Sequence, residues 1–164
     1  MTAPLLVFGW GNVSRGDDAL GPLFVQQLCA SGGIALNGRV DFLEDYQLQI
    51  EHALDLVGRK HVLFVDASLN CVAPFEVTTL HAARDVSFTT HAMSPESVMQ
   101  VYRDLHSAEP PPCTLLAIRG MGFELGAPPG QSALENLALA LSWGESWIAR
   151  NGTSDFVAQE DGDA

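Results

Sequence analysis

The sequence predicts a single α/β domain whose twisted, mostly parallel five-stranded sheet is packed between helices. Short apolar runs alternate with segments in which apolar residues recur every three or four positions, the patterns of strands and helices respectively. A chain of 164 residues is also long enough for one domain with a full hydrophobic core. We therefore expect an α/β domain over residues 1–150 and an acidic, disordered tail over residues 151–164, where glycine and polar residues dominate.

The first two expected elements are a strand over 5–10 and a helix over 18–31. The strand begins with four large apolar residues, Leu5 to Phe8, and such a run is typical of a strand buried on both faces. The later elements are expected at 39–44 (strand), 48–57 (short helix), 61–66 (strand), 75–80 (strand), 95–106 (helix), 114–119 (strand) and 131–149 (helix). Because residues 66–75 are too few for a crossover helix, one strand there is expected to be antiparallel.

Two adjacent acids, Asp17 and Asp18, follow the first strand on a glycine-rich loop. Two carboxylates about 5 Å apart at an effective dielectric constant of about 20 repel by roughly 3 kcal/mol. Such a pair, if buried, needs a cation, a proton or diverging side chains, and adjacent residues at the start of a helix usually diverge. One aspartate should cap the helix or hydrogen-bond to the loop, where it also meets the helix dipole, and the other should face the ligand-binding edge of the sheet.

Two further polar residues point to the same edge of the sheet. Asp66 ends the strand at 61–66, and ligands of open α/β sheets bind outside the carboxyl ends of the strands. His91 lies in a polar loop before the helix at 95–106, whose start is marked by Ser94 as N-cap and Pro95 as first residue. Taken singly, a strand-end aspartate and a solvated loop histidine are common. Taken together with one of the two adjacent acids, Asp17 or Asp18, they predict a site for a divalent ion such as nickel or zinc, since carboxylate and imidazole suit both.

The same segments carry a family resemblance. In order and spacing they resemble the nickel-dependent maturation endopeptidases of [NiFe] hydrogenases, over about residues 5 to 145. The stretch over residues 45–51 is similar to the Gln-Leu-x-x-Glu sequence of the subgroup that serves the soluble, NAD-reducing hydrogenase. The matching blocks are Gly9-x-Gly11-Asn12, Asp17-Asp18-x-x-Gly21, Val65-Asp66-Ala67 and Thr90-His91.

The resemblance implies a specific activity. Such enzymes remove the C-terminal peptide of the hydrogenase large-subunit precursor after nickel insertion, so the nickel is supplied by the substrate. Residue by residue, the metal-contacting and catalytic positions fall on Asp18, Asp66 and His91. The supporting loop falls on Gly9, Gly11, Asn12 and Asp17. The family position matched by Asp18 is often glutamate, which leaves the relative roles of Asp17 and Asp18 open.

Composition and motifs exclude several other classes of function. A formal net charge of −12 argues against nucleic acid and anionic membranes as partners, because phosphate contacts need cations. The chain has neither a Gly-x-Ser-x-Gly elbow nor a His-Glu-x-x-His motif, and Ser14 stands where a dinucleotide fingerprint needs its third glycine. No apolar run of about 18 residues and no signal peptide is present, so we expect a cytoplasmic protein and, by default, a monomer.

Two alternative functions share part of the pattern. A non-catalytic, nickel-sensing chaperone for the same precursor would use the same ligands. A receiver-type signalling domain also has an acid pair after its first strand, but here the pair follows Gly11 by six residues, and Arg119-Gly120 lacks the expected lysine. The loop 120–130 is open to two interpretations as well: it holds an extended peptide or the precursor surface, or it is a plain connection packed by Met121 and Phe123.

Overall fold

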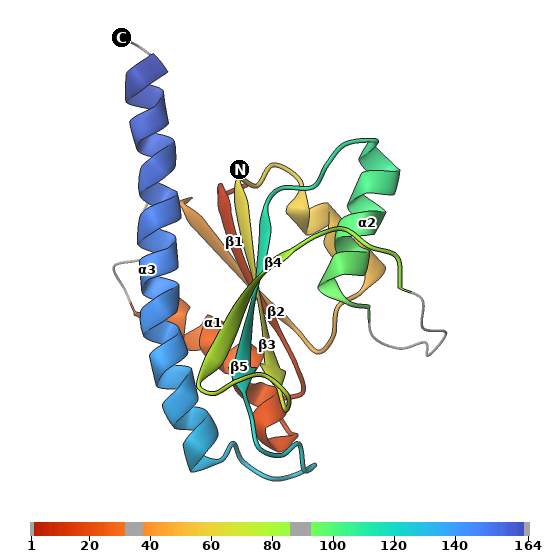
Figure 1. The fold of residues 1–164 in the computed structure, drawn as a ribbon, viewed down its shortest axis with the longest axis vertical. Helices are drawn as coiled ribbons and strands as arrows, with labels where there is room; N and C mark the ends of the chain where they lie inside the picture. Colours follow the sequence, from red (N-terminus) through yellow and green to blue (C-terminus); the bar gives the residue numbers. More distant parts are fainter. Residues whose placement is uncertain (1, 32–37, 86–92, 163–164) are drawn as a thin grey trace.

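The computed structural model describes residues 2–31, 38–85 and 93–162 (Figure 1). The strands are β1 (Leu5–Trp10), β2 (Val40–Asp45), β3 (His61–Ser68), β4 (Phe75–Leu80) and β5 (Cys113–Arg119). The α-helices are α1 (Leu20–Ala30), α2 (Pro95–His106) and α3 (Gln131–Gly162), and two 3₁₀ helices are η1 (Gly16–Ala19) and η3 (Ile50–Leu56).

The strands form one five-stranded sheet in the order β2-β1-β3-β5-β4. Strands β2, β1, β3 and β5 are parallel, whereas β4 at the edge pairs antiparallel with β5. The predicted fold class is therefore confirmed, and so is the antiparallel strand expected after the short connection. The carboxyl ends of all the parallel strands lie at one edge of the sheet, the lower end in Figure 1. We call this end of the sheet, formed by the carboxyl ends of the parallel strands, the carboxyl edge. The opposite end, where these strands begin, is the amino edge.

The sheet has a hydrophobic core on each face. Along β1, Leu5 and Val7 pack on one side with α1 and α3, whereas Leu6 and Phe8 pack on the other with η3 and α2. Figure 1 shows the same layers, with α1 and α3 on one side of the sheet and α2 on the other. The strand needs apolar residues at consecutive positions because it is covered on both faces.

The element boundaries differ from the sequence prediction most clearly at two helices and at β3, which continues past Asp66 to Ser68, so Asp66 lies within the strand and does not end it. The helix expected at 18–31 is preceded by η1, and α1 itself begins at Leu20. The helix expected at 131–149 continues as α3 to Gly162, so the structure has helix over 151–162, where a disordered tail was expected. The division into a domain over 1–150 and a tail stays a prediction. Within the described ranges, no helix combines the length and the apolar character needed to cross a membrane.

Candidate active site

The order of the strands places the candidate site between β1 and β3. From β1 the chain passes to β2 on one side, and from β3 it continues to β4 and β5 on the other, so the strand order reverses at this point. Ligands of open α/β sheets bind at the carboxyl ends of the strands where this reversal occurs. Asp18 follows β1 and Asp66 lies near the end of β3. Tertiary structure thus brings together two of the three predicted site residues.

Close glycine contacts explain how the acid pair reaches this position. A side chain on Gly9 would overlap with the backbone of Gly21, and one on Gly21 would overlap with Trp10 and lie 2.9 Å from the Val65 carbonyl oxygen. The start of α1 therefore lies directly on the ends of β1 and β3. Gly11, with φ of +150°, packs against the Asp18 backbone in a conformation that suits glycine. These contacts hold Asp18 beside the end of β3.

Asn12 organises the loop around Asp18. Its backbone N–H donates to Asp18 Oδ2 at 3.0 Å, and its side-chain oxygen accepts from the Ser14 N–H at 2.9 Å. Its amide nitrogen donates to the hydroxyl of Tyr46, beyond the end of β2, at 3.2 Å. Asn12 therefore links the loop after β1 to the loop after β2.

Asp17 points away from Asp18 into the loop 120–130. Its side chain is buried, with 3% of the residue exposed. Oδ2 accepts the N–H groups of Met121 at 2.7 Å and Gly122 at 3.3 Å, and Oδ1 accepts that of Gly130 at 2.7 Å. The predicted divergence of the two side chains is confirmed: Asp17 binds the loop, while Asp18 stays beside Asp66.

Asp66 is a mostly buried carboxyl group without a cationic partner among the described residues. Burial, together with the negative charge of Asp18, raises its pKa to about 7, although a backbone hydrogen bond from Ala67 opposes this. Near neutral pH the group is therefore partly protonated. A cation between Asp18 and Asp66 would relieve both the repulsion and the cost of burial, so these donors fit a divalent ion.

The third predicted residue, His91, lies outside the described residues. Asp66 shares a sheet face with Phe64, two positions earlier, and that face is covered by η3 and α2. Met93, two residues after His91, packs into the same core cluster, and its N–H donates to the Leu48 carbonyl at 3.5 Å. Within the described part of the chain, no group of three histidine, cysteine or acidic residues is arranged to hold a metal.

Sequence reasoning did not single out a buried histidine near this edge. His52, 8% exposed, accepts the Gln49 N–H at Nδ1 (2.8 Å), and its Nε2 lies 3.0 Å from Asp45 Oδ2. Since Nδ1 accepts, Nε2 carries the proton and donates to Asp45. The pair joins the end of β2 to η3. The spacing of Gln49 and His52, which cap η3 reciprocally, is a local signal that could have indicated it.

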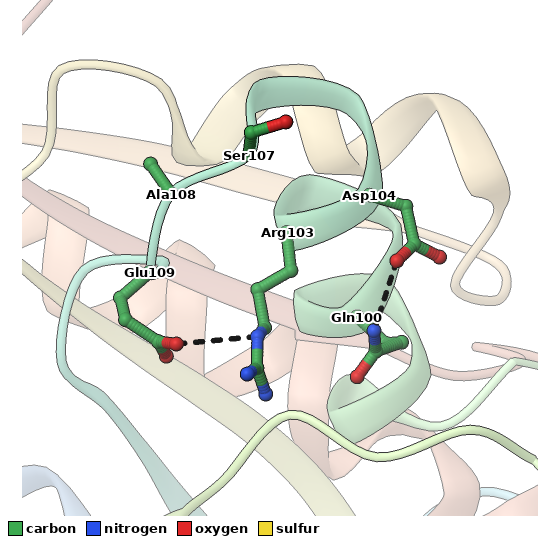
Figure 2. Close-up of a pocket in the computed structure, with 6 residues that line it drawn as sticks. All are labelled: Gln100, Arg103, Asp104, Ser107, Ala108 and Glu109. Carbon is green, nitrogen blue, oxygen red and sulfur yellow. Dashed lines mark hydrogen bonds and ion pairs between the residues drawn. The ribbon is translucent and has the colours of Figure 1, made fainter.

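The structure also has a polar hollow away from the Asp18–Asp66 site. It measures about 490 Å³ and lies at the end of α2, lined by polar and charged side chains (Figure 2). Arg103 Nε pairs with Glu109 Oε1 at 3.2 Å, and Gln100 donates to Asp104 at 3.0 Å. The lining charges thus already have partners. The hollow precedes β5, at the amino edge, so it is separate from the Asp18–Asp66 site.

Known structures resemble this fold. No protein-family model and no curated protein matches the sequence. HybD, a hydrogenase maturating endopeptidase from E. coli, matches with a TM-score of 0.71 and 21% identity over 93% of this chain and 94% of its own. HycI, a [NiFe] hydrogenase maturation protease from Thermococcus kodakarensis, matches with a TM-score of 0.67 and 18% identity over 90% and 93%. A hydrogenase 2 maturation peptidase from Thaumarchaeota archaeon SCGC_AB-539-E09 gives 0.63 and 20% over 88% and 97%.

This chain has the fold of the hydrogenase maturation proteases. The likeness extends over about nine-tenths of the chain and of each of these three proteins. At such low identity a shared fold does not carry an activity with it, because one fold can host unrelated functions. The functional assignment therefore depends on the residues of the site.

Proposed function

We propose that this protein is an endopeptidase that removes the C-terminal peptide of a [NiFe]-hydrogenase large-subunit precursor after nickel insertion. The observation that carries the proposal is the position of Asp18 and Asp66, two neighbouring carboxylates where the strand order reverses, beside which the described residues place no cationic side chain. The fold supports the same conclusion, because it is the fold of proteins described as hydrogenase maturation proteases.

In this proposal, Asp18, Asp66 and His91 contact nickel that arrives within the precursor. A carboxyl group must lose its proton before it can bind a metal, so the raised pKa of Asp66 makes metal binding at this site depend on pH near neutrality. In the proposal the enzyme holds no nickel of its own and recognises the nickel of its substrate. When bound, the metal polarises the scissile carbonyl group or a water molecule. The activity is thus that of an aspartic-type endopeptidase dependent on substrate nickel.

We further propose the precursor of a soluble, NAD-reducing hydrogenase as the partner. This finer assignment is supported by the similarity of the stretch over 45–51 to the Gln-Leu-x-x-Glu sequence of the subgroup that serves that hydrogenase. A cytoplasmic monomer is the form that we propose for the enzyme.

The test is a cleavage assay with purified precursor, either nickel-loaded or nickel-free, in which the mass of the large subunit is measured before and after incubation. We expect loss of a C-terminal peptide from the nickel-loaded form only. Cleavage of both forms would contradict the role of nickel. Binding without a change of mass would favour the chaperone, and neither binding nor cleavage would refute both assignments.

The structure weakens the receiver-type alternative. Doubly wound sheets of that type are parallel and have the strand order 2-1-3-4-5. Here the order ends β5-β4, and β4 is antiparallel. In addition, Asp17 is engaged by three backbone N–H groups, so the two adjacent acids do not face one ligand together.

A further inference from the structure

The loops at the carboxyl edge are joined to one another by hydrogen bonds. Residues 14–17, after β1, and the loop 120–130, after β5, are paired by three backbone bonds in addition to the three that Asp17 accepts. The backbone bonds run from Gly126 N to Ser14 O (2.7 Å), from Gly16 N to Ala127 O (2.9 Å) and from Asp17 N to Gly122 O (3.0 Å). Because six bonds hold the two loops together, they form one rigid unit directly beside Asp18.

Two neighbouring loops are attached to this unit. The Gly120 N–H donates to the Ser68 carbonyl at 2.9 Å, and Arg119 Nη1 donates to the Cys71 carbonyl at 2.7 Å, which ties down the loop between β3 and β4. On the other side, the bond from Asn12 to the Tyr46 hydroxyl attaches the loop after β2. The four loops surround the ends of β1 and β3, where Asp18 and Asp66 lie.

These fixed loops carry large apolar side chains that the described residues leave uncovered. Each is between 42% and 72% exposed. An apolar surface held in place by its backbone binds a partner at little entropic cost, and clusters of exposed apolar residues mark sites of protein interaction. We call this set the apolar rim: Val13, Tyr46, Leu69, Val72, Met121 and Leu125.

The charge of the same edge restricts the partner. Among the described residues, the acids around the rim are Asp18, Asp66, Glu124 and Glu76, which accepts the Val72 N–H; the cations are Arg15 and Arg119, and Arg119 already donates to backbone carbonyls. With a formal net charge of −12, a second copy of this chain would be repelled, and so would nucleic acid. The matching surface is therefore a protein segment that combines apolar side chains with lysine or arginine.

We infer that the apolar rim docks a cationic, apolar surface of the protein substrate next to the peptide bond to be cleaved. This inference rests on the proposed function, because it takes the large-subunit precursor as the occupant. Docking on a preformed rim would hold the precursor so that its nickel reaches Asp18 and Asp66. Specificity for one precursor would then come from the rim, since the metal itself is common to all nickel-loaded precursors.

The experiment compares two double variants of the full-length protein on the nickel-loaded precursor of an NAD-reducing hydrogenase. In the test variant, Met121→Ser and Leu125→Ser remove two apolar side chains of the rim. In the matched control, Leu105→Ser and Leu139→Ser remove two leucines of similar exposure from α2 and α3. Melting curves establish that both variants are folded. KM and kcat for cleavage, Kd for the precursor, and the sedimentation of each protein alone are then measured.

We expect the rim variant to raise KM and Kd roughly tenfold or more while kcat changes little, and the control variant to match the wild type. Unchanged KM and Kd in the rim variant would overturn the inference, and so would equal effects in both variants. A wild-type dimer that the rim variant dissociates would also overturn it, because the rim would then join two copies. If the wild type binds but does not cleave, a weaker Kd of the rim variant still supports the docking surface, although the proposed activity has failed.

Discussion

The two edges of the sheet place aspartate side chains in opposite electrostatic environments. At the amino edge, Asp41 forms an ion pair with Arg59 and accepts the Ala3 N–H, and Arg59 also donates to the carbonyls of Ala3 and Asp55. Burial by itself would raise the pKa of Asp41. The hydrogen bond and charge of Arg59, with the bond from Ala3, outweigh burial and hold this pKa below its usual value.

At the carboxyl edge, Asp66 faces another acid. Burial and the charge of Asp18 raise its pKa to about 7, against an ordinary value of 3.8. The same residue type therefore stabilises the fold at one edge and opposes it at the other. Residues that lower stability where ligands bind are typical of functional sites, since a bound ligand can compensate for the cost. The contrast predicts that substitutions at the two edges affect different properties.

The largest expected effect is on activity at the carboxyl edge. Asp66→Asn keeps the size of the side chain but removes the charge that binds metal, so we expect the cleavage rate of the nickel-loaded precursor to fall roughly 10³-fold or more. The matched change at the amino edge is Arg59→Met. It should leave cleavage unchanged and lower the free energy of unfolding by about 1–3 kcal/mol, because a buried cation with several bonds is lost. Mass spectrometry and urea titration give the two values, and the reverse pattern would contradict the contrast.

His91→Ala extends the comparison to the loop before α2. We expect a loss of processing of roughly 10²-fold or more, because an imidazole ligand or proton carrier is removed. Stability should change by less than about 0.5 kcal/mol, since a loop side chain contributes little to core packing. His106→Ala, at the end of α2, is the matched control for loss of a histidine. Normal processing by the His91 variant would exclude this residue from the site.

The next prediction distinguishes the two adjacent acids by the contribution of each to stability. Asp17→Ala leaves three backbone N–H groups of the loop 120–130 without an acceptor, so we expect the free energy of unfolding to fall by about 3 kcal/mol. Asp18→Ala removes one hydrogen bond but also relieves repulsion of Asp66, and should change stability by no more than about 1 kcal/mol. Urea titration of both variants measures the difference. Equal losses would show that the two acids share one structural role.

A smaller effect depends on pH. The pKa of Asp66 is raised in the folded state, so below about pH 4 both states are protonated and folding carries no penalty from this group. Between pH 4 and 7 the Asp66 carboxyl group ionises in the unfolded state before it does so in the folded state, so the free energy of unfolding falls as the pH rises. Above pH 7 the group is ionised in both states, and the loss is constant. At about 1.36 kcal/mol per pKa unit, Asp66→Asn should be about 2–4 kcal/mol more stable than the wild type at pH 8. The two proteins should be equally stable at pH 4 in thermal unfolding, and a gain that does not vary with pH would contradict this origin.

The sequence by itself determined the strands, the α/β class and the presence of one antiparallel strand. Its apolar runs and helix-start signals are local, and so is the shortness of the connection after Asp66, which excluded a crossover helix. It also placed acids after β1 and near the end of β3, where the carboxyl ends of parallel strands meet. The role of His91 stays a prediction, because that residue lies outside the described part of the chain.

The tertiary structure determined that Asp17 binds the loop 120–130 and that Asp18 lies beside Asp66. Asp17 and Asp18 are neighbours in sequence, and no local pattern distinguishes them. They differ because the N–H groups that bind Asp17 belong to a loop more than 100 positions away, with Met121 at a separation of 104 residues. The raised pKa of Asp66 likewise depends on burial and on Asp18, which lies near it only in the folded sheet. Hydrogen-bond partners and desolvation are set by contacts distant in sequence, so only the folded chain fixes them.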